Sequence, residues 1–317
     1  MQKITVIGAG TMGANIALNF SANGYSVRLQ DIDARQLERA METVRSNAAM
    51  LRSHGLLAVS VDDVAGRIAT GERMEKAVAG SELVIEAVPE RLELKHELFK
   101  QLDQLCGDAT ILASNTSTFV PSSLADGILG GKRKERFLVM HYWNPAHLVP
   151  LVELVPHPLT RPAVVGEIKG LLERCGKTPV LVRREIAGFI GNRLAFALQR
   201  EAMDLVARGI ASPEDVDTVA RAGFGRRIPI SGVFGTADLG GLDVYLEVCR
   251  SIFAELCADK EPPNGLKQLV EQGKLGVKSG AGWKRYSEEE IARLKQDLTA
   301  ELIRHLRRDH ELAARSK

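Results

Sequence analysis

A histidine and a glutamate interrupt two apolar runs in the middle of the chain. His141 ends the run FLVM, and Glu153 lies twelve residues later within LVPLVELV. An ionisable group is costly to bury without a partner, so both residues need an explanation. If the two runs pair as neighbouring strands, the imidazole and the carboxylate can meet, which is the geometry of an oriented general base.

A glycine-rich turn near the N-terminus has the spacing of a dinucleotide-binding loop. Gly8, Gly10 and Gly13 form GxGxxG between the strand-like run ITVIG and a helical pattern. The first glycine permits a tight turn, the second lets the backbone approach a diphosphate, and the third allows the helix to pack closely on the strand. Thr11 and Met12 complete the loop at the expected helix N-terminus, where free N–H groups favour an anion.

An acidic residue at the end of the second strand-like run predicts which dinucleotide binds. Asp31 follows SVRLQ and lies eighteen residues beyond Gly13, close to the roughly 20 expected of a ribose-binding acid. Its carboxylate would accept hydrogen bonds from the ribose hydroxyls and repel a 2′-phosphate. NAD is therefore expected rather than NADP, although Arg35 could offset part of this charge.

Short apolar runs alternate with helical patterns over the first part of the chain. Continuous Val- and Ile-rich runs are typical of strands buried on both faces. This rhythm predicts an α/β fold, with a Rossmann-like, doubly wound, mostly parallel sheet and helices on both faces. The expected strands cover residues 4–8, 26–31, 83–88, 111–115, 137–143, 151–156 and 178–183, and the expected helices cover residues 34–54, 90–106 and 162–175.

The strand patterns stop at about residue 185, and helical patterns continue beyond it. Ser212 followed by Pro213 indicates one helix start, and Ser287 with Glu290 forms a capping-box pattern before a last helix. That last helix has an apolar stripe, which would pack on its own domain or on a partner subunit. We therefore expect two domains, residues 1–185 and an all-helical domain of residues 186–317.

Composition and charge argue against several classes of protein. The 317-residue chain is 45% hydrophobic and 26% charged, and its net charge of +2 gives no electrostatic case for binding nucleic acid or a membrane surface. The N-terminus MQKITVIG is typical of a strand rather than of a signal peptide, and no apolar run of ~18 residues could cross a bilayer. The four cysteines lack zinc-site spacing, so no metal is expected. The sequence predicts a cytoplasmic protein.

Along nearly its whole length, the chain contains the motifs GAGTMG (8–13), Asp31, VIEAVPE (84–90), SNTS (114–117), HYWNP (141–145), LVELV (151–155), GFIGNR (188–193) and KLGVKSGAGW (274–283). Taken together and in this order, they resemble the 3-hydroxyacyl-CoA dehydrogenase family. The resemblance implies a Rossmann-like NAD-binding domain and a helical C-terminal domain that makes a homodimer. It also implies oxidation of an L-3-hydroxyl group to a ketone, with transfer of a hydride to NAD.

By this resemblance, four residues carry the catalysis. His141 is the general base, and Glu153 orients it and stabilises the imidazolium. Ser117 and Asn192 position the substrate oxygen, although Ser117 could instead cap a helix and Asn192 could be purely structural. Asn144 matches a position that orients the substrate, but a residue before a proline could also be a simple turn residue.

The same resemblance assigns further residues to the cofactor. Glu90 and Lys95 match positions that contact the nicotinamide side of NAD. Their other interpretation is surface solvation, because both are charges near the start of an expected helix. Asn115, in the SNTS motif, joins Gly8, Gly10 and Asp31 as an expected cofactor-binding residue.

Two features depart from the CoA-thioester enzymes that the chain resembles. Pro150 stands where those enzymes typically carry a lysine. Residues 34–66 contain no lysine, whereas the corresponding insert of those enzymes is lysine-rich and meets the CoA phosphates. Both departures bring the chain closer to the branch that resembles lambda-crystallin and L-gulonate 3-dehydrogenase, whose members have a VPLVELVPHP-like segment.

Three functions follow from these patterns. The first is NAD-dependent interconversion of a short-chain L-3-hydroxyacyl-CoA and its 3-keto form, as in fatty acid metabolism. The second is the same reaction on a free 3-hydroxy acid such as L-gulonate. The third is a non-catalytic, crystallin-like protein, and the presence of His141, Glu153, Ser117 and Asn192 argues against it.

Overall fold

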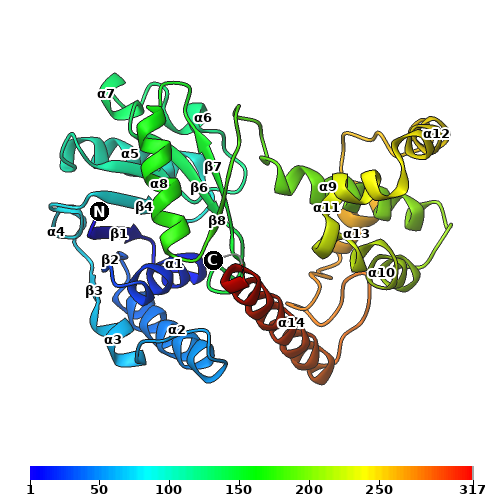
Figure 1. Cartoon of the computed structure of the whole chain (residues 1–317), viewed down its shortest axis with the longest axis horizontal. Helices are drawn as coiled ribbons and strands as arrows, with labels where there is room; N and C mark the ends of the chain where they lie inside the picture. Colours follow the sequence, from blue (N-terminus) through cyan, green and yellow to red (C-terminus); the bar gives the residue numbers. More distant parts are fainter. Residues whose placement is uncertain (316–317) are drawn as a thin grey trace. The chain divides into compact units, whose positions relative to one another are not determined.

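The computed structural model of the chain describes residues 1–315 and contains one eight-stranded sheet (Figure 1). The strands are β1 (Lys3–Ile7), β2 (Ser26–Gln30), β3 (Ile68–Gly71), β4 (Leu83–Glu86), β5 (Ile111–Ser114), β6 (Phe137–Tyr142), β7 (Leu151–Pro156) and β8 (Thr178–Leu181). Their order is β3-β2-β1-β4-β5-β6-β7-β8, and every neighbouring pair is parallel except β6 and β7. The mostly parallel, Rossmann-like sheet expected from the sequence is confirmed.

Helices connect the strands, and after β8 the named elements are all helical. Among the strands lie α1 (Thr11–Ala22), α2 (Ala34–Ser53), α3 (Val61–Gly66), α4 (Met74–Val78), α5 (Leu92–Leu105), α6 (Pro121–Ala125), α7 (Gly131–Lys134) and α8 (Pro162–Arg174). After β8 come α9 (Gly191–Ala207), α10 (Pro213–Ala222), the 3-10 turn η1 (Phe224–Arg226), α11 (Ile228–Gly240), α12 (Leu242–Ile252), α13 (Asn264–Glu271) and α14 (Glu288–Arg315). The three helices predicted before residue 185 are confirmed as α2, α5 and α8.

Alternate residues of the central strands fill two hydrophobic cores, one on each face of the sheet. Val6 and Met140 belong to one core, whereas Ile7 and Val139 belong to the other. Successive side chains of a strand point to opposite faces, so the continuous apolar runs supply both cores at once. Helices α1, α2 and α8 contribute to the first core, and α5 and α6 contribute to the second.

The helix starts predicted beyond residue 185 have the expected caps. The Ser212 hydroxyl accepts a hydrogen bond from the amide of Asp215, which completes a capping box before α10. Ser287 and Glu290 make the reciprocal bonds of the predicted box before α14. These local signals define both helix starts, because the capping side chains accept hydrogen bonds from N–H groups that have no partner within the helix.

Several short elements escape the sequence patterns. β3 is a four-residue strand at the edge of the sheet, and Ile68 is its buried residue. Helices α3, α4, α6 and α7 have between four and six residues. These helices are too short for a helical periodicity to show in the sequence, and β3 has no continuous run of large apolar residues.

Contacts between residues divide the chain into two compact units. The first contains Met1–Asn192 together with the chain from Thr299 onward, and the second is Arg193–Leu298. This differs from the predicted boundary after residue 185, because α14 begins in the second unit and ends in the first. Ile303 is buried in the first core, and Leu302 and Leu306 pack against it.

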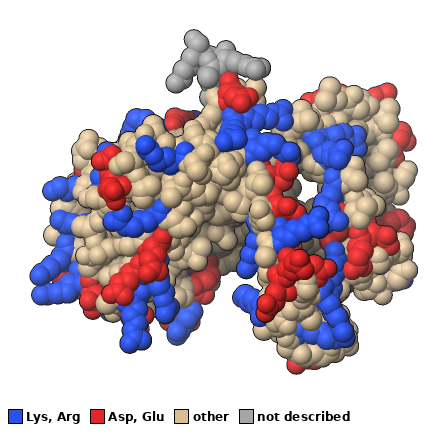
Figure 2. All heavy atoms as spheres, turned by 90° about the horizontal axis from the view of Figure 1, so that it is seen from below, with Lys and Arg blue, Asp and Glu red and all other residues tan. Residues whose placement is uncertain are grey.

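The second unit exposes much of its apolar surface. None of the described helices α9 to α13 contains a buried residue. On the face that Figure 2 presents, basic and acidic side chains are interspersed. No helix within residues 1–315 is long and apolar enough to cross a membrane.

Candidate active site

The turn between β1 and α1 forms one wall of a cavity at the carboxyl ends of the strands. Gly8 has a φ of 97°, and an added Cβ there would lie 2.6 Å from the carbonyl oxygen of Ala87. An added Cβ at Gly13 would lie 1.8 Å from the carbonyl oxygen of Gly8, whereas no atom lies within 4 Å of one at Gly10. Gly8 and Gly13 therefore close the turn, and Gly10 leaves room for a ligand.

Asp31 lies on the rim of the same cavity, at the end of β2. Its Oδ2 accepts a hydrogen bond of 2.8 Å from the amide of Ala9, and its Oδ1 accepts one of 3.1 Å from the amide of Asp33. The Gln36 side chain donates to the carbonyl of Ala9 at 3.0 Å, which ties α2 to the turn. The cavity has a volume of about 770 Å³, and its lining includes Gly8, Gly10, Thr11, Met12, Asp31 and Ile32.

These features fit a dinucleotide. Helix α1 begins at Thr11 with no side-chain cap at Gly10, so the N–H groups of its first turn are available to a diphosphate. The Asp31 carboxylate is fixed beside the turn, where it can accept hydrogen bonds from ribose hydroxyls. The crevice also lies where strand order reverses between β1 and β4, the usual ligand position of such sheets.

His141 and Glu153 face each other across the antiparallel pair β6 and β7. They are direct partners in the strand register, so their side chains leave neighbouring positions on the same face. His141 Nδ1 lies 2.9 Å from Glu153 Oε2, and the two residues are 4% and 1% exposed. The pairing of the two apolar runs that the sequence predicts is confirmed.

Glu153 accepts three further hydrogen bonds. The amides of Ile190 and Gly191 donate to its Oε1 at 2.9 and 3.0 Å, and Trp143 Nε1 donates to its Oε2 at 3.3 Å. Burial acts to raise the pKa of Glu153, but the hydrogen bonds, led by that of His141, together hold the pKa below its usual value. The carboxylate therefore stays charged at neutral pH and favours a proton on His141 Nδ1.

Ser117 and Asn192 lie next to each other although they are far apart in the sequence. Asn192 Nδ2 donates a hydrogen bond of 3.0 Å to the carbonyl of Ser117. Asn192 directly follows Gly191, whose amide binds Glu153, so the first turn of α9 contacts both the Glu153 carboxylate and the Ser117 loop. Ser117 itself is exposed.

The two other asparagines singled out in the sequence have different surroundings. Asn115 follows β5, and its Oδ1 accepts a hydrogen bond of 2.9 Å from the amide of Tyr142. That bond fixes the backbone next to His141, on the adjacent strand. Asn144 is exposed in the connection from β6 to β7, and its peptide bond with Pro145 is cis.

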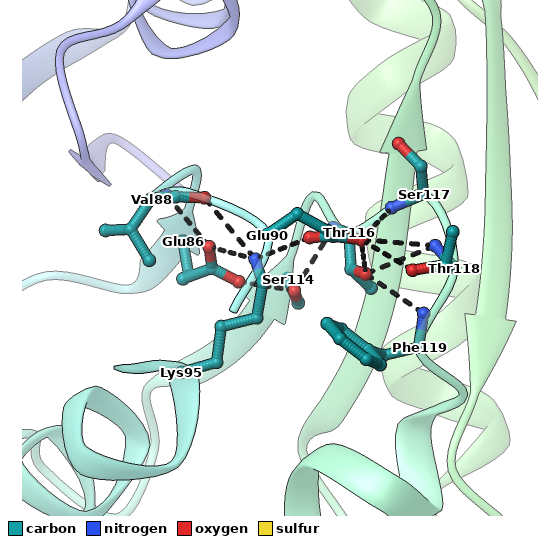
Figure 3. Close-up of polar contacts among 9 residues, drawn as sticks. All are labelled: Glu86, Val88, Glu90, Lys95, Ser114, Thr116, Ser117, Thr118 and Phe119. Atoms are coloured by element: carbon teal, nitrogen blue, oxygen red, sulfur yellow. Dashed lines mark hydrogen bonds and ion pairs between the residues drawn. The ribbon is translucent and has the colours of Figure 1, made fainter. Parts of the chain in front are cut away.

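Glu90 holds the loop that carries Ser117 (Figure 3). Its Oε1 accepts hydrogen bonds from the hydroxyls of Thr116 and Thr118 and from the amides of Ser117 and Thr118, at distances of 2.5 to 3.3 Å. Burial acts to raise the pKa of Glu90, but these bonds and the neighbouring Lys95 lower it overall. A charged acceptor thus organises the loop.

Lys95 lies under this loop, where Figure 3 shows it between two carboxylates. Its side chain is 1% exposed, and Nζ lies 2.6 Å from Glu86 Oε1 and 3.1 Å from Glu90 Oε2. The Ser114 hydroxyl donates to the other oxygen of Glu86, and burial raises the pKa of Glu86 despite these partners. The resemblance predicts a nicotinamide contact for Lys95, whereas in the structure its ammonium group is enclosed and links Glu86 to Glu90.

Sequence reasoning missed three parts of this site. Glu86 is a carboxylate inside the apolar run LVIEAV, which is the same signal that pointed to His141 and Glu153. Trp143 lies two residues beyond His141, a spacing that puts both side chains on one side of an extended chain. Gly191 had no signal of its own, because its contacts come from a distant strand.

Two family models match consecutive parts of the chain. The 3-hydroxyacyl-CoA dehydrogenase NAD binding domain matches residues 3–186, and the C-terminal domain of the same family matches residues 188–286. The chain belongs to the 3-hydroxyacyl-CoA dehydrogenase family. It is therefore an NAD-dependent oxidoreductase that acts on CH–OH groups, and the resemblance seen in the sequence is confirmed.

Named relatives span most of this dehydrogenase. It is 33% identical over 303 residues, 96% of each chain, to the 5-formyl-3-hydroxy-2-methylpyridine 4-carboxylate 5-dehydrogenase of Mesorhizobium japonicum. It is 38% identical over 238 residues, 74% of each chain, to the lambda-crystallin homolog of Homo sapiens. A solved structure of a 5-formyl-3-hydroxy-2-methylpyridine 4-carboxylic acid 5-dehydrogenase aligns with a TM-score of 0.90 and 32% identity, covering 98% of this chain and 99% of that one.

Proposed function

We propose that this dehydrogenase interconverts a small L-3-hydroxyacyl substrate and its 3-keto form, with His141 as the general base. The observation that carries the proposal is the 2.9 Å contact between His141 Nδ1 and Glu153 Oε2. A charged carboxylate at Nδ1 keeps the proton there and leaves Nε2 free to accept another. In oxidation, Nε2 takes the proton of the 3-hydroxyl group, and in reduction it returns that proton to the ketone oxygen.

The neighbouring residues complete the proposed reaction. Glu153 stabilises the imidazolium that proton transfer creates, because an opposite charge at hydrogen-bond distance favours the protonated ring. NAD, when bound, accepts the hydride that leaves C3 during oxidation. Ser117 and Asn192 bind the substrate oxygen, and the hydrogen bond between the Asn192 side chain and the Ser117 carbonyl supports this shared role.

For the substrate class, we propose a free hydroxy acid ahead of the CoA thioester that the sequence ranks first. Arg45 forms an ion pair of 2.9 Å with Asp62, and Arg52 donates to the carbonyl of Val59 at 2.8 Å. Two of the four arginines of α2 are therefore engaged within their own segment, and residues 34–66 contain no lysine for CoA phosphates. Pro150 likewise adds no charge before β7. The relative from Mesorhizobium japonicum is named for a free carboxylate.

A substrate panel tests the class. We expect kcat/KM for L-3-hydroxybutyrate or L-gulonate to exceed that for L-3-hydroxybutyryl-CoA by about tenfold or more, because unpaired CoA phosphates would gain little on this surface. NADH absorbance reports each rate. The reverse ranking would assign the thioester, which the family name favours. NAD binding without turnover on any hydroxy compound, or on the pyridine aldehyde acid of the named relative, would instead favour the crystallin-like alternative.

Substitution of the proposed acid–base pair tests the mechanism. His141→Ala should lower kcat by ~10² to 10⁴ and leave NAD binding intact, since loss of a general base typically has this effect. Glu153→Gln should lower kcat more than it weakens NAD binding, because the amide no longer stabilises the imidazolium. His305→Ala, at an exposed position on α14, is the control. Unchanged turnover in His141→Ala would reject the assignment.

We also propose that the helical unit forms a homodimer. Phe234 on α11 and Leu239 near its end are 85% and 83% exposed, and Leu242 and Phe253 of the following segment are exposed as well. An apolar surface of this kind usually marks an interaction site, and a two-fold dimer covers one patch with its own copy. Light scattering should give twice the chain mass, and the pair Phe234→Glu with Leu239→Glu should give monomers. A wild-type monomer at micromolar concentration would contradict this.

A further inference from the structure

The chain turns sharply just before α9, and the turn aims backbone amides at the Glu153 carboxylate. Gly188 has a φ of 74° and Phe189 a φ of 51°, so a residue with a bulky side chain adopts the left-handed region. The Phe189 side chain is fully buried, and its ring centroid lies 5.3 Å from that of His141. The amides of Ile190 and Gly191, which follow directly, both donate to Glu153 Oε1.

Gly191 leaves the space that the indole ring of Trp143 occupies. An added Cβ at position 191 would lie 2.4 Å from Cζ2 and 3.1 Å from Cε2 of Trp143, and 3.3 Å from Glu153 Oε2. The indole N–H donates to that same oxygen, which also binds His141 Nδ1. The centroids of the indole and imidazole rings are 5.7 Å apart. A side chain at 191 would therefore displace the indole from both Glu153 and His141.

The surroundings of the pair contain little other charge. The turn before α9 contributes two amides and the Phe189 ring, and β8 places Val180 beside Glu153 in the register. Within the described residues, no hydrogen bond or ion pair joins His141 or Glu153 to any charged side chain outside the pair. Besides His141, the groups that stabilise the negative charge of Glu153 are therefore neutral donors: the indole N–H of Trp143 and the amides of Ile190 and Gly191.

We infer that Trp143 and Gly191 are positioning residues for the general base, which hold the Glu153 carboxylate against His141 and share its negative charge. This inference rests on the proposed role of His141. Each donor that is lost leaves more negative charge to act on the imidazole, and this favours the protonated ring. Because the base must be unprotonated to accept the substrate proton, the acid limb of the oxidation rate then moves to higher pH.

Trp143→Phe tests the charge-sharing step. It removes the indole N–H and keeps an aromatic ring in the position. We expect the acid limb of kcat/KM for oxidation to move up by roughly 0.3 to 1 pH unit, while the KM for NAD stays within about threefold of wild type. Trp283→Phe, the same change at the other tryptophan, should leave the profile unchanged.

Gly191→Ala tests the packing step. The added methyl group should push the indole aside and lower kcat by about tenfold or more, because small displacements at a reacting centre are costly. Adding Trp143→Phe should relieve the clash, since phenylalanine lacks the fused six-membered ring of the indole, to which the two atoms near the methyl group belong. The double variant should then match Trp143→Phe alone. Gly166→Ala, inside α8 with no atom within 4 Å of the new Cβ, is the control.

Two outcomes would overturn the inference. The first is a pH profile of Trp143→Phe that coincides with that of wild type. The second is a double variant whose kcat falls by the product of the two factors by which the single variants lower it. If Gly191→Ala does not fold, the Trp143→Phe profile decides alone. Failure of the proposed function would look different, because His141→Ala would then retain wild-type turnover whatever the Trp143 variants do.

Discussion

At the scale of single residues, the glycines of the β1–α1 turn differ in what surrounds them. The space beside Gly10 is open to the cofactor cavity, whereas the carbonyl of Gly8 occupies the space beside Gly13. Gly10 has a φ of −69°, which alanine adopts without strain. The same substitution at these two positions should therefore affect different properties.

Gly10→Ala should weaken NAD binding and leave stability almost unchanged. The methyl group enters the space where the backbone must approach the diphosphate, so we expect the Kd for NAD to rise by about tenfold or more. Gly13→Ala should instead lower the free energy of unfolding by about 1–3 kcal/mol or more, as overpacking does. Calorimetric NAD titration and urea unfolding separate the two effects. Equal losses of stability in both variants would contradict this division.

Residues with a local signal could be predicted, and residues defined by distant contacts could not. His141 and Glu153 were visible as ionisable residues in apolar runs, and their strand pairing is confirmed. Trp143 could not be distinguished from an ordinary core aromatic, because its hydrogen bond goes to a different strand. Lys95 matched a family position, but its burial between two carboxylates depends on the fold rather than on its neighbours in the sequence.

At the scale of elements, the loop after β5 depends on Glu90 for its conformation. The loop has no regular structure from residue 115 to residue 120, yet four donors from Thr116 to Thr118 converge on one carboxylate oxygen. Hydrogen bonds to a charged acceptor are stronger than neutral ones, typically by about a factor of two. The position of Ser117 therefore depends on a side chain from the preceding connection, between β4 and α5.

Glu90→Gln should lower kcat by about tenfold, because the neutral amide binds the loop more weakly and leaves Lys95 with one carboxylate. Steady-state kinetics report the loss, and Glu93→Gln, at an exposed position on α5, serves as the matched control. In a Ser117→Ala background the effect of Glu90→Gln should shrink, since the loop no longer has that hydroxyl to position. An undiminished effect would show that Glu90 acts by another route.

Strands with a continuous apolar run and helices of several turns could be predicted from the sequence, whereas the edge strand β3 and the helices of one turn could not. All seven strands expected from apolar runs are present, as β1, β2 and β4 to β8. The edge strand β3 was missed because Ile68 alone of its four residues is buried. Helices α6 and α7 were missed because a single turn has no periodicity. Register between strands is a tertiary property, so only the pairing of β6 with β7 was foreseen, through its two ionisable residues.

At the scale of the whole molecule, α14 belongs in part to each of the two compact units. The sequence predicts its apolar stripe but not the surface that the stripe covers. In the structure, Ile303 and its neighbours pack on the core of the first unit, while Leu294 and Leu298 remain exposed. A chain that returns to an earlier unit leaves no signal in composition or periodicity, because the contact joins residues that are hundreds of positions apart.

Stability should depend on the titration of Lys177. Its buried Nζ donates to the carbonyls of Ala146 and Val149, in the connection from β6 to β7. Burial lowers the pKa of Lys177 from 10.5 to about 8, and Cys175 opposes this only in part. Between these two values the unfolded chain binds more protons than the folded one, so this group makes stability rise with pH. The neutral amine keeps two N–H donors for the two carbonyls.

Lys177→Met should remove that pH dependence. We expect the free energy of unfolding of wild type, relative to that of the variant, to increase from pH 8 to pH 10 by up to about 3 kcal/mol. One unit of pKa difference between the folded and unfolded states corresponds to about 1.4 kcal/mol. Urea unfolding at several pH values measures this, and Lys169→Met, at an exposed position on α8, is the control. A difference that stays constant or falls with pH would contradict the burial argument.

The antiparallel pairing of β6 with β7 also bears on how such an enzyme could be redesigned. His141 meets Glu153 because the backbone ladder aligns them. In the connection at residues 143–150, Ala146 and Leu148 are buried in the first core, and the carbonyls of Ala146 and Val149 accept hydrogen bonds from Lys177. An exchange between relatives that keeps these residues, Trp143 and the length of the connection should leave the two ionisable groups in place. Loop exchange in this segment should therefore alter which molecules are accepted while the proton-transfer chemistry is inherited unchanged.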